Sequence, residues 1–240
     1  MKSQIDYLEH KRMTEQEMAE GRMIIDMILT DSLPAQPGDL IHALLQRVGI
    51  FETVPPSVRL HPHLPYFIGD DQFGAHPAMV MPLRTGAGEY VGVSTVYLAE
   101  DGFAPVVSPN QLNLLVEYPG MFFALDGEVG PVIAVATGLG HALSARALMP
   151  LEASMCIVRD LEDMADFDWP QGTAELIVLC DDSTRDQAQT LIDRATQAGI
   201  KAQACTPPTQ GTSWLDEYLF KGAIPADEIA AAKQSGSPTH

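Results

Sequence analysis

Two aspartates directly follow a buried apolar run near residue 180. Leu176 to Cys180 is typical of a buried strand, and Asp181 and Asp182 come immediately after it. In a parallel α/β sheet, ligands bind beyond the carboxyl ends of the strands, and Mg²⁺ prefers oxygen ligands such as carboxylates. Asp181 and Asp182 are therefore candidate metal ligands. The alternative is that both acids lie at the start of the next helix, where the helix dipole favours negative charge.

The sequence around these aspartates predicts a parallel sheet covered by helices on both faces. Apolar runs alternate with helical patterns, and the predicted strands are 132–136, 154–158, 176–180 and 201–205. One helix is expected over about 141–148. Another begins at the capping box of Ser183 and Asp186 and ends at Gly199. Thr137 follows the first strand, so it marks a second strand end at which a ligand could bind.

The first 128 residues are predicted to be helical and then rich in β-structure. Thr14 and Glu17 form a capping box that starts a helix, and a second helix is expected over residues 39–48. A loop rich in proline and histidine follows at 54–66, and residues 85–89 suit a hairpin loop. The β-prone runs are 78–84, 90–98, 112–117 and 121–125. The expected units are a helical segment (1–50), a β-rich region (51–128), an α/β domain (129–222) and a flexible tail (223–240).

A run of acidic side chains lies between two of the predicted strands. Its members are Asp160, Glu162, Asp163, Asp166 and Asp168. A solvated helix face or loop is the common explanation for such a run. The alternative is a docking surface for a basic partner, or a surface that imitates nucleic acid. Trp169 follows the run and would give that surface an aromatic anchor of the kind enriched at interfaces.

A group of histidines in the β-rich region could suggest a zinc site. His61, His63 and His76 lie close together in the sequence, with Pro62 and Pro65 among them. Structural zinc sites usually need four ligands, and no further Cys or Asp stands at ligand spacing. We therefore expect a loop packed on its neighbours rather than a metal site.

The composition limits the partners that this chain could bind. The 240 residues include 14 Lys and Arg against 32 Asp and Glu, which gives a net charge of −18 at pH 7. This balance argues against a broad basic surface for nucleic acid and against docking on an anionic membrane.

Cys156, Cys180 and Cys205 lack paired spacing, so no disulfide framework is predicted. Since neither a signal peptide nor a membrane span is indicated, we expect a soluble cytoplasmic protein.

The order of these features resembles the Toprim domain, and more specifically the Toprim-containing primase-like proteins of phages and plasmids. Segments of that family like V-A-E-G-I-E-T-A-L-A, A-D-N-D and D-W-N-D-x-L correspond here to Val135–Ser144, Cys180–Ser183 and Ser213–Leu219. Upstream matches are Asp39–Ile50, Pro56–Pro62, His76–Val80 and Gly92–Leu98. The resemblance implies an α/β fold with a Toprim-like parallel sheet flanked by helices, preceded by a helical segment and a small β-rich region.

The resemblance also implies a catalytic site that this sequence keeps only in part. In active Toprim domains, a glutamate after the first strand does acid–base work and an Asp-x-Asp pair binds Mg²⁺. The glutamate position is Thr137 here and the second aspartate position is Ser183, so only Asp181 remains. Threonine cannot accept and return a proton near neutral pH as a carboxylate can. Gly140 and Ser94 replace two further family residues, a second glutamate and a histidine.

These departures predict a catalytically degenerate primase-like protein. We expect a binding or regulatory module in mobile-element DNA replication or transfer, with a protein partner, weak or no direct binding of nucleic acid, and no cofactor. One alternative is a Mg²⁺-dependent primase or nuclease whose metal site is rebuilt from Asp181 and Asp182. The other is a small-molecule binder on the same frame, with its ligand near Thr137 and Ser183.

Overall fold

The computed structural model describes residues 15–69, 71–114, 118–149 and 151–223. The helices are α1 (Glu15–Asp31), α2 (Leu40–Arg47), α3 (Leu139–Leu148), α4 (Leu161–Ala165), α5 (Arg185–Gln197) and α6 (Trp214–Ala223). The strands are β1 (Leu33–Pro34), β2 (Arg59–Ile68), β3 (Asp71–Arg84), β4 (Tyr90–Ala99), β5 (Gly102–Phe103), β6 (Asn110–Leu114), β7 (Phe122–Ala124), β8 (Val132–Thr137), β9 (Ser154–Val158), β10 (Glu175–Leu179) and β11 (Lys201–Cys205). The predicted cap Thr14 and almost all of the predicted tail lie outside the described residues.

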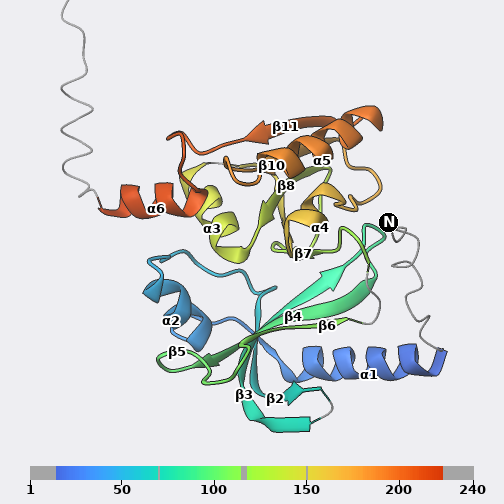
Figure 1. Ribbon diagram of the computed structural model, residues 1–240, viewed down its shortest axis with the longest axis vertical. Coiled ribbons are helices and arrows are strands. Elements are labelled where there is room, and N and C mark those ends of the chain that lie inside the picture. The colour runs from blue at the N-terminus through green and yellow to red at the C-terminus, as the bar shows by residue number, and fades with distance from the viewer. Residues whose placement is uncertain (1–14, 70, 115–117, 150, 224–240) are drawn as a thin grey trace, which may run out of the picture.

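One mixed sheet connects the two halves of the molecule (Figure 1). Its strand order is β1-β2-β3-β7-β9-β8-β10-β11, and β4 pairs with β3, β5 and β6 beside this path. The strands β9, β8, β10 and β11 are parallel to one another. β7 is antiparallel to both β9 and β3, so it joins the parallel half to the antiparallel half. The predicted parallel sheet, preceded by a helical and a β-rich region, is confirmed.

Helices cover both faces of the parallel strands, as their apolar sequences predict. Successive side chains of a strand point to opposite faces. Ala134 and Ala136 of β8 accordingly lie in a buried cluster with residues of α3 and α6, whereas Ile133 and Val135 lie in a second cluster with residues of α4 and α5. Both clusters remove apolar surface from water, which is the main favourable contribution to folding.

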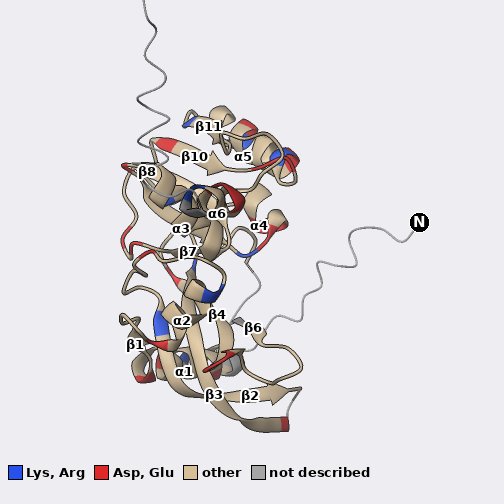
Figure 2. Ribbon diagram, turned by 90° about the vertical axis from the view of Figure 1, so that its left-hand side faces the viewer, with Lys and Arg blue, Asp and Glu red and all other residues tan. Residues whose placement is uncertain are grey.

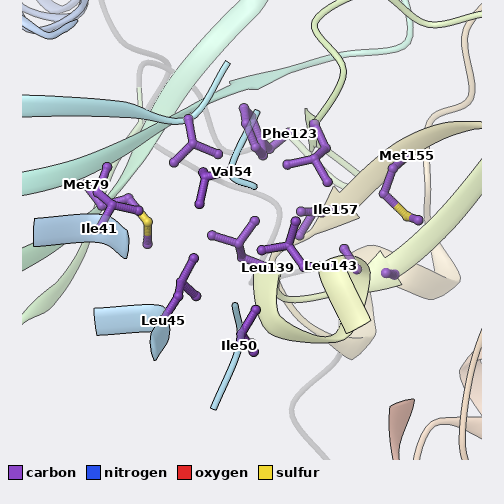
Figure 3. Close-up of a cluster of buried hydrophobic side chains, with 14 of the residues drawn as sticks. Ile41, Leu45, Ile50, Val54, Met79, Phe123, Leu139, Leu143, Met155 and Ile157 are labelled. Atoms are coloured by element: carbon purple, nitrogen blue, oxygen red, sulfur yellow. The ribbon is translucent and has the colours of Figure 1, made fainter. Parts of the chain in front are cut away.

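The first of these clusters also includes the N-terminal part of the chain. Ile41 and Leu45 of α2 lie in the same buried cluster as Leu139 and Leu143 of α3 (Figure 3). The helical and β-rich regions therefore share a core with the α/β half. α1 instead packs on β2 through Ile25 and the residues around it, in a cluster of its own.

The predicted proline- and histidine-rich loop is wrong over most of its length, because residues 59–68 form strand β2. Within the part of the chain that the structure describes, β2 beyond Leu60 pairs only with β3, so one side of the strand makes no ladder hydrogen bonds there. The pairing with β3 shifts register around Pro62 and again after Pro65. An edge strand with bulges tolerates proline, because the missing N–H would have had no partner.

The second helix begins as its sequence predicts. The Asp39 carboxylate accepts a 3.0 Å hydrogen bond from the backbone N–H of His42, which is the expected N-cap interaction.

Among the residues that the structure describes, no helix is long and apolar enough to cross a membrane.

Candidate functional site

The predicted strand-end residues lie at one edge of the parallel sheet. Thr137 is the last residue of β8 and pairs in register with Val158 at the end of β9. On the other side of β8, Val135 pairs with Val178 of β10. Continuing that register along the two parallel strands brings Thr137 opposite Cys180, so Asp181 follows at the same edge. The fold therefore brings Thr137 and Asp181, two of the positions that the resemblance singles out, to the same edge of the sheet.

Asp181 uses one of its carboxylate oxygens to hold the turn that follows it. Its Oδ1 accepts hydrogen bonds from the backbone N–H and the Oγ–H of Ser183, at 2.9 and 2.6 Å, and from the backbone N–H of Thr184 at 3.2 Å. The backbone N–H of Asp181 in turn donates to Oγ1 of Thr184 at 2.9 Å. This is the geometry of an aspartate that closes a local turn before a helix.

These hydrogen bonds also set the charge state of Asp181. Partial burial of the carboxyl raises its pKa, but the hydrogen bonds from Ser183 and Thr184 outweigh burial and keep the pKa of Asp181 below its ordinary value. The group is therefore ionised at neutral pH, and its negative charge is stabilised by the turn itself.

The start of α5 differs from the sequence prediction. The predicted cap was Ser183 paired with Asp186, but the N-cap residue is Thr184, and its side chain makes no capping hydrogen bond. Ser183 instead donates both its N–H and its hydroxyl to Asp181. The Ser183 hydroxyl and N–H are therefore both engaged by the ionised Asp181 carboxylate, which is a strong hydrogen-bond acceptor.

Asp182, the second candidate ligand, is paired with an arginine that follows it in the chain. Its Oδ1 forms an ion pair with the Arg185 guanidinium, and both side chains are largely exposed. Exposed pairs of this kind contribute little to stability. The pair nevertheless places a positive charge beside Asp182, which opposes the binding of a cation there.

At the other strand end, Thr137 is followed by a glycine with a special backbone. Gly138 has φ of +79° and is the N-cap residue of α3, without a side-chain hydrogen bond. Glycine adopts this conformation without the steric cost that other residues pay. Gly138 therefore forms a tight turn into α3, directly after Thr137, where the resemblance implies a glutamate.

Both carboxylates at this edge already have hydrogen-bond or ion-pair partners within the protein. Mg²⁺ is bound through one or two carboxylates with near-ideal octahedral geometry, and it gives up its water reluctantly. Here Asp181 has one oxygen committed to the turn, Asp182 is paired with Arg185, and Thr137 and Ser183 carry neutral hydroxyls. Within the described residues, no group of three or more His, Cys, Asp and Glu side chains is placed to hold a metal ion.

Sequence reasoning missed Arg159, which lies at the same edge directly after β9. Its Nε atom is 2.9 Å from Oδ2 of Asp160 and 3.0 Å from Oδ2 of Asp163. The signal was present in the sequence, because Arg159 follows an apolar strand just as Asp181 does. Two carboxylates compensate its charge within the protein, so Arg159 does not present an open cation to an anionic ligand.

The acidic run after β9 is not a uniform solvated face. Asp160 caps α4 by accepting the N–H of Asp163 at 2.9 Å. Asp163 is only 3% exposed, and its Oδ1 accepts the backbone N–H of Gly120 at 3.1 Å. Asp168 accepts the backbone N–H of Gly86 at 2.6 Å. These acids tie the loops of the β-rich half to the α/β half.

This arrangement decides which residues of the run could contact a partner. Burial removes Asp163 from any docking surface, and Asp168 is occupied by Gly86, whereas Glu162 and Asp166 are exposed. Trp169 is partly buried, and the guanidinium of Arg194 lies 4.9 Å from the centroid of its ring. The predicted aromatic anchor is therefore already covered by a cation of the protein itself.

The three histidines lie on strands rather than in a loop. Burial of His61 lowers its pKa, and its Nδ1 accepts the backbone N–H of His63 at 3.2 Å. The ring of His76 meets the ring of Tyr97 edge to face, with centroids 6.4 Å apart. His61 and His76 therefore make packing and local hydrogen-bond contacts, but they do so on strands and not in the packed loop that the prolines predicted.

Family models match the two halves of the chain separately. Residues 19–135 match a domain of unknown function, DUF7146, and residues 132–223 match the Toprim domain. A comparison with curated proteins found no match. The second model covers β8 through α6, which includes both strand ends described above.

The structure is similar to solved structures of DNA primases. The DnaG primase catalytic domain bound to ssDNA aligns with a TM-score of 0.58 at 12% identity, over 92% of this chain and 80% of that chain. A DNA primase domain from Pseudomonas aeruginosa gives 0.48 at 11% identity, over 90% and 77%. The RNA polymerase domain of Mycobacterium tuberculosis primase DnaG gives 0.47 at 14% identity, over 92% and 91%. The chain thus has an α/β fold similar to that of the DnaG primase catalytic domain, and its residues 132–223 match the Toprim domain model.

Proposed function

We propose that this protein is a catalytically degenerate primase-like protein that acts as a binding or regulatory module in mobile-element DNA replication or transfer. The observation that carries the proposal is the composition of the strand-end edge. Two of its three Toprim-equivalent positions are the neutral residues Thr137 and Ser183, and the third, Asp181, is hydrogen-bonded to Ser183. The mobile-element setting rests on the resemblance of the sequence motifs to phage and plasmid proteins.

The chemistry of phosphoryl transfer supports this interpretation. Metal ions bridge and neutralise the charge that develops on the transferring phosphoryl group, and the protein must hold those ions in place. A glutamate at position 137 could in addition move a proton, whereas threonine cannot near neutral pH. With Asp181 as the one Toprim-equivalent carboxylate, the described strand-end edge offers neither the full set of metal ligands nor the acid–base group that the resemblance implies.

The electrostatics favour a protein partner over nucleic acid. The similar DnaG catalytic domain is bound to ssDNA, but this chain carries a net charge of −18. Phosphate backbones are bound by Lys and Arg. Arginines near the strand ends, Arg159 and Arg185, are paired with acids, and Arg194 covers Trp169. In Figure 2, blue and red segments are interspersed along the fold without a continuous basic stripe in that view.

A primer-synthesis assay tests this proposal. The full chain is incubated with a single-stranded template, ribonucleotides and Mg²⁺ or Mn²⁺, and an active primase is run beside it. We expect no template-dependent product. Product that is lost in Asp181→Ala and kept in the exposed control Asp193→Ala would instead establish a rebuilt active site, and with it the enzyme alternative.

A further inference from the structure

An apolar row lies on the outer face of α1, opposite the face that packs on β2. Residues four apart follow one another along the same side of a helix. Ala19, Met23 and Met27 have this spacing and form the methionine row. Ile25 and Ile28 fall on the other side of the helix, where they are buried against β2. Met23 and Met27 are 58 and 53% exposed, so no other part of the described structure covers the row.

The methionine row and its polar neighbours form one continuous surface. The row lines a shallow groove together with Arg22, Asp26, Thr30 and Asp31. All of these residues belong to a single helix of 17 residues, so helix geometry fixes their positions relative to one another. The helix is about 25 Å long, so a second helix can lie along the row with the side chains of the two helices interlocked.

The charges around the methionine row are mostly negative. Glu20 and Asp26 lie three residues before and three residues after Met23, so they flank the row on its two sides, and both are exposed. The helix as a whole carries one base against several acids. The base is Arg22, and the acids are Glu15, Glu17, Glu20, Asp26 and Asp31.

The bases near α1 do not balance these acids. Arg22 lies further round the helix from the methionine row than the two flanking acids do. Arg59 reaches the C-terminal end of the helix, where its guanidinium donates to the backbone carbonyl oxygens of Leu29 and Ser32 at 3.3 and 2.6 Å. Even when both arginines are counted against the acids of α1, the charge of this surface is negative.

This charge restricts the occupant of the groove. A second copy of the chain would bring the acids of two α1 helices together, which is unfavourable. Nucleic acid and anionic membranes are themselves negative, so the same acids would repel them. An amphipathic helix with an apolar stripe flanked by Lys and Arg matches both the methionine row and the acids beside it. Methionine side chains are flexible and adapt their packing to such partners.

We infer that the methionine row of α1 is a docking site for a basic amphipathic helix of a partner protein. The inference goes beyond the proposed function and does not depend on it, since the row lies away from the strand-end edge. In Figure 1 and Figure 2, α1 lies at the opposite end of the molecule from β10 and α5. A helix bound to α1 would therefore leave the strand ends accessible.

Fluorescence anisotropy with a labelled peptide tests the inference. The probe is a Leu/Lys peptide designed as an amphipathic helix of the same length as α1, and the comparison peptide has the same composition in scrambled order. The full wild-type chain is expected to bind the amphipathic peptide more tightly than the scrambled one. The double variant Met23→Ser with Met27→Ser should weaken binding at least about tenfold, because it removes the apolar contact. Val107→Ser, which removes an exposed apolar side chain elsewhere, should not.

A second pair of variants tests the acids beside the row. Glu20→Gln with Asp26→Asn should weaken binding of the amphipathic peptide about threefold and reduce its dependence on salt, because two attractive charges are lost. The matched control is Asp193→Asn, which removes an exposed charge of α5 and should leave binding unchanged. All of the substituted side chains are exposed, so circular dichroism should show the wild-type fold for each variant.

Other outcomes would overturn the inference. Equal binding of the two peptides, or binding of neither, would leave no role for an apolar stripe. Unchanged binding by the variant with both methionines replaced would place the peptide elsewhere on the chain. A dimer in sedimentation velocity that dissociates in that variant would assign the row to a second copy. Displacement of the probe by a synthetic peptide of residues 1–14 would assign the row to the N-terminal segment of the chain itself.

Discussion

The Oγ atom of Ser183 donates a 2.6 Å hydrogen bond to Oδ1 of Asp181. Together with the backbone N–H groups of Ser183 and Thr184, this hydrogen bond stabilises the negative charge of Asp181. Ser183 stands where the resemblance to active Toprim domains implies a second aspartate, and we propose that the edge has lost a metal ligand in this way. The hydrogen bonds of the turn contribute to folding, so their energetics can be measured as folding stability.

Removing the Asp181 carboxylate should weaken the turn into α5. Asp181→Ala leaves the N–H groups of Ser183 and Thr184 without their acceptor, so the free energy of unfolding should fall by about 1–2 kcal/mol. Asp181→Asn keeps an oxygen acceptor and should lose less. Urea denaturation of the three proteins measures both differences. Equal stability of Asp181→Ala and wild type would contradict the role of this turn.

The stabilisation by Asp181 should also depend on pH. Its pKa is lower in the folded state than the ordinary value of 3.8, so folding favours the ionised form. The contribution of Asp181 to the free energy of unfolding is complete above the pKa that it has in the unfolded chain. It is lost as the pH falls through its pKa in the folded state. We therefore expect wild type to lose stability relative to Asp181→Asn between about pH 5 and pH 2. Parallel curves for the two proteins over this range would count against the hydrogen bonds.

The buried carboxyl of Asp163 should give the opposite pH dependence. Burial raises its pKa above 3.8, although Arg159 and the Gly120 N–H act in the other direction. The Asp163 carboxyl therefore stabilises the folded state below the pKa that it has in the unfolded chain. This stabilisation is lost as the pH rises through its pKa in the folded state. As the pH rises through this range, the free energy of unfolding of wild type should fall relative to that of Asp163→Asn. Thermal melts at a series of pH values measure this, and a wild-type advantage that grows with pH would refute it.

Gly120 should be the least replaceable glycine at the junction of the two halves. It has φ of +73°, and a Cβ there would meet the backbone carbonyl oxygen of Asp166. Gly127 has φ of +84° with open space around it, so it is the matched control. Gly127→Ala should cost about 1 kcal/mol from backbone strain alone, and Gly120→Ala about 3 kcal/mol or more because the clash is added. Similar unfolding midpoints for the two variants would disprove this ranking.

Much of the fold could be predicted from local sequence. The parallel strands are short apolar runs, and the strand ends that they imply bring Thr137 and Asp181 to one edge. The β2 strand could not be predicted, because Pro62 and Pro65 look like breakers until β2 is known to be an edge strand. Local pattern carries no information on whether a strand has one neighbour or two.

The details of the candidate site depended on partners that are distant in sequence. Nothing near Asp163 or Asp168 indicates that their acceptor oxygens serve Gly120 and Gly86, which lie in loops of the other half. The cap of α5 differs for a local reason, since the Asp181 carboxylate accepts the Ser183 N–H that Asp186 would accept in a capping box. The residue types at the strand ends could be predicted to lie together, but the hydrogen bonds that their side chains make could not.

Calorimetric titration of the full chain with Mg²⁺ tests most directly whether the strand-end edge has lost its metal site. We expect no saturable binding at millimolar Mg²⁺ by wild type, and new binding in the double variant Thr137→Glu with Ser183→Asp, which returns the two missing carboxylates to the edge. Saturable binding by wild type that disappears in Asp181→Ala would contradict the account.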